Sequence, residues 1–253
     1  MNRVEIPLAA VRSGGTARFP LGADPGAPWA LLSLRPLGSM RYLHDEPNPL
    51  RETFFRGHGI EPGRVLAVEL VHSRTVLYPR GPEELRGARA DGIIVEPGPW
   101  VPTVTVADCM PIWIRHPESG AYGVLHSGWQ GTGILEAAVR GLGERFGASP
   151  SEIDAFLGPA IGPCCYRVSE ERARIFRAEF GSDAVRLEGG DWRLDLGAAN
   201  LGIAGRLGLR SVTRILGCTS CDGDLGSFRR EGPSDFTRMV AAAVCGPPGR
   251  DAA

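Results

Sequence analysis

Short apolar runs separated by turn-forming residues make up most of this chain, and only a few segments have apolar residues at helical spacing. The runs that predict strands cover 30–35, 65–71, 92–95, 101–107, 111–115, 121–126, 153–157 and 212–216. The Pro-Glu-Ser-Gly sequence at 117–120 predicts a turn that joins two of these strands as a hairpin. The segment 13–29, rich in glycine, alanine and proline, predicts a loop, and 246–253 predicts a frayed terminus.

Three segments have the pattern of a capped helix. Thr132, Ser169 and Asp195 each precede a stretch with apolar residues three or four positions apart. The first of these helices is expected to end at Phe146 and the second at Phe180, since a glycine follows each. The chain therefore has fewer predicted helices than predicted strands.

Because many strands follow one another directly, the pattern favours an α+β fold with mixed or antiparallel sheets covered by helices, rather than a doubly wound fold. A weaker apolar pattern indicates one more helix within 48–59. No internal repeat and no linker-like segment divides the sequence. We therefore expect one domain over 1–253.

Composition excludes several classes of partner. The 253 residues are 43% apolar and carry a formal net charge of -1, so nothing global indicates binding to nucleic acid or to a membrane surface. No stretch approaches the roughly 20 apolar residues of a membrane helix, and the first residues lack the apolar core of a signal peptide. We expect a cytoplasmic location, in which the six cysteines are mostly reduced thiols.

His72, Cys109 and His126 are the candidate metal ligands, because each lies at a predicted strand end or tight turn. Two imidazoles and a thiolate match a catalytic zinc site with one position open to water or substrate. Asp91 and Asp108 are candidate acceptors for the second ring nitrogens of the histidines. The same residue types are also typical of a core cysteine and of hydrogen-bonded turn histidines, so spacing alone leaves both interpretations open.

A second cysteine motif, Cys218 and Cys221, has the Cys-x-x-Cys spacing of half a zinc knuckle. We find no second pair of this kind in the sequence. The prediction is a loop that carries two thiols.

Six segments resemble one known family. They are VHSRTV at 71–76, TVADCMPI at 105–112, HSGWQGTG at 126–133, LGPAIGPCCYRV at 157–168, DLGAANLGIAGRLG at 195–208 and SFRREG at 227–232. In this order and spacing they resemble the laccase-domain, or multicopper polyphenol oxidase-like, family, whose members are mostly regarded as purine nucleoside phosphorylases. The resemblance covers about 30–245.

The resemblance implies a single α+β domain of sheets sandwiched by helices, and zinc bound by His72, Cys109 and His126, with copper or iron as other candidate metals. It implies phosphorolysis of adenosine and inosine, with methylthioadenosine as a further candidate substrate and adenosine deamination as a side activity. The small-molecule partners are then a nucleoside and phosphate, and the oligomeric state is left open. Catalysis is expected to involve Cys109, His126 and Asp108, the first of which is a candidate both as ligand and as nucleophile.

Phosphate is normally held by arginines and backbone amides. Arg229 and Arg230 are the candidates, with Ser227 beside them and Arg35 as a third arginine. Before the first histidine the chain keeps Arg35 and Gly38 but departs from the rest of the family pattern, which leaves the preferred nucleoside open.

Three other interpretations remain. A metal-assisted hydrolase with Cys109 as nucleophile and His126 as base fits an amide of a cell-wall precursor. A copper-dependent polyphenol oxidase is a weaker candidate, because such an enzyme needs several copper centres and the chain has only five histidines, of which His44, His58 and His116 lie in segments without ligand character. A non-catalytic metal-binding module is the third.

Overall fold

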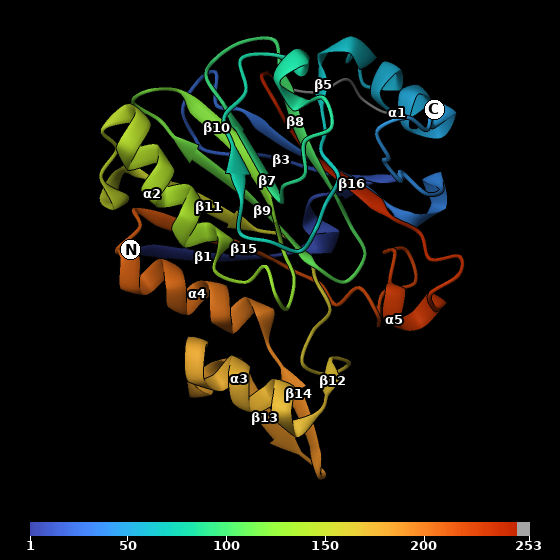
Figure 1. Cartoon of the computed structure of the whole chain (residues 1–253), viewed down its shortest axis with the longest axis vertical. Coiled ribbons are helices and arrows are strands. Elements are labelled where there is room, and N and C mark those ends of the chain that lie inside the picture. The colour runs from blue at the N-terminus through green and yellow to red at the C-terminus, as the bar shows by residue number, and fades with distance from the viewer. Residues whose placement is uncertain (247–253) are drawn as a thin grey trace.

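The computed structural model describes residues 1–246, which form two large sheets, a small third sheet and five helices (Figure 1). The seven-stranded sheet has the order β1 (Asn2–Pro7), β15 (Ser211–Leu216), β11 (Asp154–Leu157), β9 (Met110–His116), β10 (Ala121–Ser127), β7 (Gly92–Val95) and β6 (Val76–Leu77). The six-stranded sheet has the order β2 (Arg12–Ser13), β3 (Thr16–Pro20), β4 (Trp29–Ser33), β16 (Met239–Val244), β8 (Val101–Val106) and β5 (Val65–Leu66). The small sheet consists of β12 (Arg167–Val168), β14 (Asp191–Leu194) and β13 (Val185–Glu188).

The helices are α1 (Pro49–Gly57), α2 (Ile134–Phe146), α3 (Glu170–Phe180), α4 (Leu196–Leu207) and the single turn α5 (Phe228–Glu231). Short 3-10 turns occur at Leu8–Ala10, Arg35–Leu37, Pro62–Arg64, Pro82–Leu85, Pro150–Glu152 and Ser182–Ala184. None of the helices within 1–246 is long and apolar enough to cross a membrane.

The predicted caps are confirmed for two helices. The side chains of Ser169 and Asp195 accept hydrogen bonds from backbone N–H groups at the start of α3 and α4. The predicted Thr132 cap is wrong. Helix α2 begins after Gly133, which has a φ of 106°, and the Thr132 hydroxyl instead donates to the carbonyl of Gly128 at 2.6 Å. The glycine turn takes the position that a capping hydroxyl would need.

Three apolar layers hold these elements together. Alternate residues of β9 show the arrangement, because Ile112 and Ile114 belong to the apolar cluster that includes residues of α2 and α4, while Trp113 belongs to the cluster that includes the six-stranded sheet. A third cluster lies between α1 and the outer face of the six-stranded sheet, and contains Phe55 and Val240. The central strands are buried on both faces, which explains their continuous apolar sequences. The predicted α+β fold, with mixed sheets covered by helices, is confirmed.

One edge of the seven-stranded sheet gathers the chain segments that carry the candidate site. Strands β9 and β10 form the predicted antiparallel hairpin, so the start of β9 lies beside the end of β10. Strand β11 runs antiparallel to β9 and parallel to β15, so the segments that follow β11 and β15 leave the sheet at this same edge. Residues far apart in the sequence therefore meet there.

Part of the sequence prediction is wrong. The segment 13–29 is not a continuous loop, because β3 lies within it and buries Ala17 and Phe19 against β4. The predicted strand 65–71 is only two residues long before the chain bends away. Strands β1 and β16 were not predicted, although β16 has a short continuous apolar sequence of small residues. Of the predicted tail, 247–253 lies outside the described residues.

We predict that the chain unfolds as one cooperative unit. Limited digestion with a nonspecific protease is expected to remove residues at the termini and to cut at the exposed turn 22–26, while β3 is protected by its pairing. Mass spectrometry of the products checks this. Two stable fragments of similar size would contradict it.

Candidate metal centre and pocket

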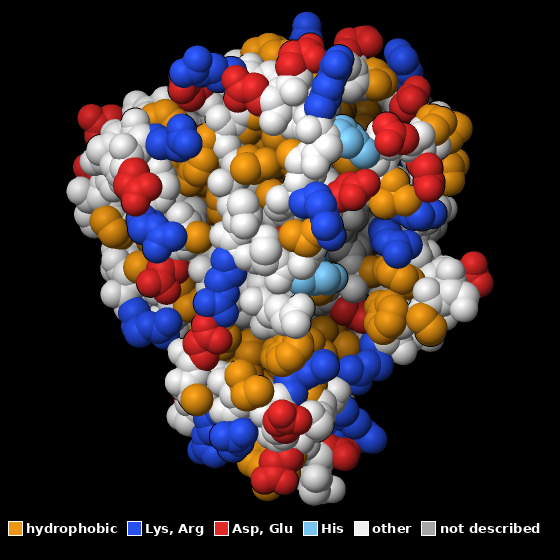
Figure 2. All heavy atoms as spheres, in the orientation of Figure 1, with side chains coloured by type: hydrophobic (Ala, Val, Ile, Leu, Met, Phe, Trp, Pro, Cys, Tyr) orange, Lys and Arg blue, Asp and Glu red, His pale blue; other side chains and the backbone are white. Residues whose placement is uncertain are grey.

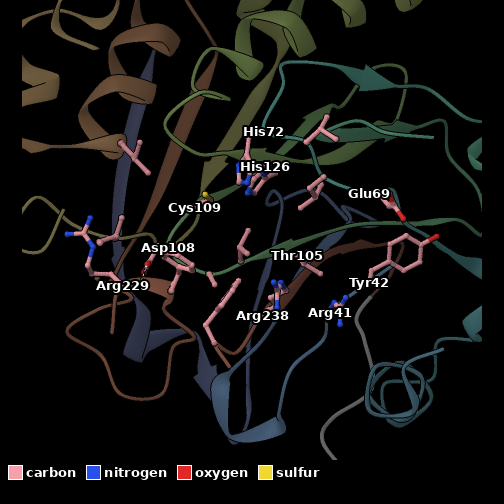
Figure 3. Close-up of a pocket in the computed structure, with 18 of the residues that line it drawn as sticks. Arg41, Tyr42, Glu69, His72, Thr105, Asp108, Cys109, His126, Arg229 and Arg238 are labelled. Atoms are coloured by element: carbon pink, nitrogen blue, oxygen red, sulfur yellow. Dashed lines mark hydrogen bonds between the residues drawn. The ribbon is translucent and has the colours of Figure 1, made fainter. Parts of the chain in front are cut away.

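His72, Cys109 and His126 converge as the sequence predicts. One ring nitrogen of each histidine and the Cys109 sulfur lie within 4.8 Å of one another, and the two imidazole centroids are 5.0 Å apart. Figure 3 shows the three side chains pointing toward one another at one end of a pocket. His126 is buried, Cys109 is half-buried and His72 is exposed, so the group opens from the core toward solvent.

Unusual backbone conformations occur at this group. His72 and Asp108 have φ angles of 57° and 80°, and within 1–246 they are the non-glycine residues with positive φ. This left-handed region is uncommon for such residues and often marks a functional site. Here it turns His72 back toward His126 and turns the chain sharply before Cys109.

Asp91 fixes the geometry of both histidines. Its carboxylate is fully buried, and Oδ1 accepts hydrogen bonds from His126 Nδ1 at 2.9 Å and from the His72 backbone N–H at 3.0 Å. Oδ2 accepts from the N–H and the hydroxyl of Ser73, at 2.6 and 2.8 Å. Burial raises the pKa of Asp91, but the hydrogen bonds from His126 and Ser73 outweigh it and hold the pKa below its ordinary value. Because Nδ1 of His126 donates to Asp91, Nε2 is the ring atom available to a metal.

The electrostatics of the group favour a thiolate. Burial opposes ionisation of Cys109, but the charge of His126 and hydrogen bonds from both histidines lower the pKa of the thiol to about 6. Burial likewise opposes the charge on His126, yet the Cys109 thiolate and the Asp91 carboxylate raise its pKa to about 10. Cys109 is therefore ready either to bind a metal or to act as a nucleophile.

The residues present fit a metal ion of the zinc type. Thiolate and imidazole are the ligands that zinc prefers, and three protein donors leave a fourth position for substrate. The neighbouring Gly128 leaves room at the sulfur, because a Cβ atom there would lie 2.6 Å from Cys109 Sγ and 3.6 Å from His72 Nδ1. Zinc bound by this set would act as a Lewis acid toward a ligand in the pocket.

The pocket beside the three ligands has a volume of about 570 Å³, which is ample for a small-molecule ligand. Hydrophobic side chains and a histidine surround a hollow on the face shown in Figure 2, where basic and acidic side chains are interspersed. The aromatic residues of the lining are Tyr42, Tyr166, Phe228 and Phe236. Figure 3 shows Arg41 and Arg238 on the side of the pocket away from the histidines.

The lining is rich in cations. It contains the arginines Arg41, Arg89, Arg172, Arg229 and Arg238, but only the carboxylates of Glu69 and Asp108. Burial first, and the nearby charge of Arg41 second, lower the pKa of Arg238. Its guanidinium lies over the ring of Phe236, 3.8 Å from the centroid. Two neighbouring arginines with so little neutralising charge favour an anionic ligand.

Of the four residues predicted to bind phosphate, only Arg229 is part of this lining. The Arg230 guanidinium donates to backbone carbonyls, among them that of Asp222 at 2.8 Å. Ser227 is buried and caps α5, and Arg35 pairs with Glu231 at 3.6 Å. These three side chains brace the segment around α5. No sequence motif indicated Arg41 or Arg238, because both lie outside the segments that resemble the family.

Asp108 differs from its predicted use as a histidine acceptor, which Asp91 fulfils. Its Oδ1 accepts from the Thr219 hydroxyl at 2.6 Å, and its Oδ2 accepts from the Arg229 backbone N–H at 2.7 Å. Asp108, which precedes Cys109, therefore links the start of β9 to the segments that contain Thr219 and Arg229.

The prediction that Cys218 and Cys221 have no partner pair is wrong. Cys164 and Cys165 lie against them, and all four sulfurs are within 4.8 Å of one another. The partner pair was missed because its cysteines are adjacent in sequence and lack the Cys-x-x-Cys spacing.

The remaining histidines do not line this pocket. His44 contacts a tyrosine hydroxyl and His58 a backbone carbonyl, as expected of structural histidines. His116 lies beside Glu118 and Glu152 in a group that could hold a metal, with Nε2 3.8 Å from a Glu152 oxygen. The expectation that the segment around His116 does not resemble a metal-ligand site is therefore corrected, because His116 belongs to a group of side chains that could hold a metal ion.

Fold and site together define a class: α+β proteins in which a two-histidine, one-cysteine ligand set lies at a sheet edge beside an arginine-rich pocket. The chain belongs to the family described as multi-copper polyphenol oxidoreductase laccase, whose family model matches residues 44–245. The family resemblance of the six sequence segments is thereby confirmed.

The relatives of this chain have a different name from the family model. A protein of Corynebacterium glutamicum, 32% identical over 69% of this chain and 72% of its own length, is named a purine nucleoside phosphorylase. So is a protein of Streptomyces coelicolor, 32% identical over 74% of this chain and 79% of its own length. The crystal structure of YlmD from Geobacillus stearothermophilus has a TM-score of 0.81 and 25% identity, and covers 92% of this chain and 97% of its own.

We predict that Asp91→Asn weakens metal binding by the His72, Cys109 and His126 set about 10–100-fold. The neutral amide is a weaker acceptor than the carboxylate for the hydrogen bond from Nδ1 of His126, so it orients the ring less firmly. Competition with a chromophoric chelator measures this affinity. Asp154→Asn is the matched control, since Asp154 is also buried but pairs with Arg115 and Arg210 elsewhere. Equal metal affinity in Asp91→Asn and the unmodified protein would contradict the role of Asp91.

Proposed function

We propose that this protein is a zinc-dependent purine nucleoside phosphorylase that acts on adenosine and inosine, with methylthioadenosine as a further substrate. One observation carries the proposal: a single pocket has the His72, Cys109 and His126 set at one end and the Arg41 and Arg238 pair at the other. The names of the relatives support the same activity.

Phosphorolysis requires a place for an anion. A nucleoside is neutral at its sugar, so the excess of arginines in the lining needs another ligand to balance it. Arg41 pairs with Glu46 at 3.5 Å, and both side chains are exposed, so that pair is weak. Inorganic phosphate between Arg41 and Arg238 would satisfy both guanidinium groups. Arg229 remains a second candidate contact.

The base and the sugar then occupy the space between the two ends. In the reaction a phosphate oxygen forms a bond to C1′ of the ribose, the bond from C1′ to the purine nitrogen breaks, and that nitrogen keeps the electron pair. Tyr166, Phe228 and Phe236 offer ring faces to the purine. Exclusion of water from the pocket by the bound substrates would limit competing hydrolysis. Zinc would supply Lewis acidity near the base, and adenosine deamination would be a side activity of the same site.

A metal-assisted cysteine hydrolase is the second candidate. The lowered pKa of Cys109, to about 6, beside His126 is also what a cysteine nucleophile requires. The two proposals differ in one respect that is easily measured, because a hydrolase needs no phosphate.

We therefore predict that base release depends on phosphate. Adenosine or inosine with phosphate is expected to give the free base and ribose 1-phosphate in equal amounts, measured by chromatography. Without phosphate the release of base should be negligible. If base is released equally well in both conditions, the phosphorylase proposal is wrong and the hydrolase becomes the leading candidate.

We further predict that Arg238→Ala raises the phosphate concentration needed for half-maximal rate. Removing one partner of a desolvated charge pair costs about 2–5 kcal/mol, which is on the order of 30-fold or more in rate at low phosphate. The KM for the nucleoside should change much less. Arg140→Ala is the control, because Arg140 is exposed on α2, pairs with Glu144 and does not line the pocket.

Arg229→Ala and Arg230→Ala separate the two phosphate candidates of the sequence. Arg229→Ala should raise the phosphate requirement because Arg229 lines the pocket, and should also lower the melting temperature because its guanidinium donates to the carbonyls of Cys165 and Arg167. Arg230 lies outside the lining and its guanidinium donates to backbone carbonyls, so Arg230→Ala should lower the melting temperature without changing the phosphate requirement. If Arg238→Ala, Arg229→Ala and Arg230→Ala all leave the phosphate requirement unchanged, this anion site is ruled out.

A further inference from the structure

We propose that Cys164, Cys165, Cys218 and Cys221 form a second metal site, a closed four-thiolate zinc site that clamps together the two segments that follow β11 and β15. This site is separate from the His72, Cys109 and His126 set and does not depend on the proposed function.

The sulfur positions fit one metal ion. Cys221 Sγ lies 3.3 Å from Cys165 Sγ and 3.6 Å from Cys164 Sγ, and all four sulfurs are within 4.8 Å of one another. A tetrahedral zinc with bonds of about 2.3 Å to sulfur requires sulfurs about 3.8 Å apart. A disulfide would need about 2.05 Å. The spacing is therefore that of ligands around an ion.

The fold explains why the four cysteines meet. Strands β11 and β15 are parallel neighbours, so the segments that follow them leave the same sheet edge, and a bridge between Ala160 and Cys218 extends this pairing beyond the strands. The first segment then turns, because the N–H groups of Cys165 and Tyr166 both donate to the carbonyl of Gly162. Within this turn both adjacent cysteines can face the Cys218–Cys221 segment.

The surroundings match a thiolate site. The backbone N–H of Gly162 donates to Cys218 Sγ at 3.2 Å, a contact that stabilises negative charge on sulfur. A Cβ atom at position 162 would lie 3.2 Å from Cys164 Sγ, which is tighter than most Cβ contacts, and at an ordinary contact distance of 3.5 Å from Cys218 Sγ. Cys164 and Cys221 are exposed, so an ion can reach the site, and four protein ligands would leave no position for substrate.

The segments that carry the four cysteines contact residues that line the pocket. Thr219, between the two cysteines of the second segment, donates its hydroxyl to Asp108, the residue before Cys109. Arg229 donates to the carbonyl of Cys165 at 2.9 Å and lies over the ring of Tyr166. A metal at the four cysteines would thus hold Tyr166 and Arg229 in place beside the first metal centre.

Metal analysis of the full-length chain tests the proposal without any activity measurement. In a Cys109→Ala background, which removes a ligand of the first site, the chain is expected to keep about one zinc. Adding Cys221→Ser or Cys164→Ser should remove it and lower the melting temperature. Adding Cys245→Ser, a change at an exposed thiol outside the cluster, should leave it. Zinc content that none of the cluster variants lowers would overturn the proposal.

A second measurement needs no variant, so it remains decisive where a variant fails to fold. Cobalt added to the metal-free unmodified protein is expected to give a sulfur-to-cobalt charge-transfer band with the intensity of five thiolates, four from the cluster and one from Cys109. An intensity of one thiolate would overturn the proposal. So would a count of free thiols, after metal removal under non-reducing conditions, that shows the cluster cysteines joined as disulfides.

Discussion

The buried carboxylate of Asp91 is the interaction on which the candidate site depends. It lies immediately before β7 and receives hydrogen bonds from the turn around His72 and from the side chain of His126 at the end of β10. Leaving such a carboxylate without partners in the core would cost several kcal/mol, so these segments are held together by the energy of satisfying one charge. The left-handed backbone at His72 is tolerated because Asp91 holds the neighbouring N–H groups.

The apolar pattern predicted the strands that are buried on both faces, such as β7 and β9, because a continuous apolar run between turns has few other uses in a chain of this kind. It failed where tertiary pairing outweighs local composition. Strand β3 lies in a segment rich in glycine and proline, and its only clear signal is the alternation of Ala17 and Phe19. Helix α2 begins at a glycine turn, so a rule that searches for capping hydroxyl groups misplaces its N-cap by one residue.

The candidate site likewise has a part that local sequence predicts and a part that only the tertiary structure shows. The convergence of the three candidate metal ligands was predictable because histidine and cysteine at strand ends often bind metals, and Asp91 was predictable as an acceptor nearby. Arg41 and Arg238 were not, since arginines are common on surfaces and only the structure shows which of them face the same cavity. Arg230 lies in a segment that resembles the family and was therefore predicted to bind phosphate. In the structure its guanidinium instead donates to backbone carbonyls.

A single topological fact connects the pocket with the four-cysteine cluster. Because β11 is parallel to β15 and antiparallel to β9, three chain segments that follow or precede these strands share one edge. Asp108 joins them through the Thr219 hydroxyl and the Arg229 backbone N–H, and each of these hydrogen bonds to a carboxylate adds about 1.5–3 kcal/mol. A metal that crosslinks the segments outside the pocket would add rigidity there, whereas a metal held by His72, Cys109 and His126 would need one position open for the proposed substrate. In this arrangement the three-ligand site would bind the substrate, and the four-cysteine site would hold the loops that form the pocket at this end of the seven-stranded sheet.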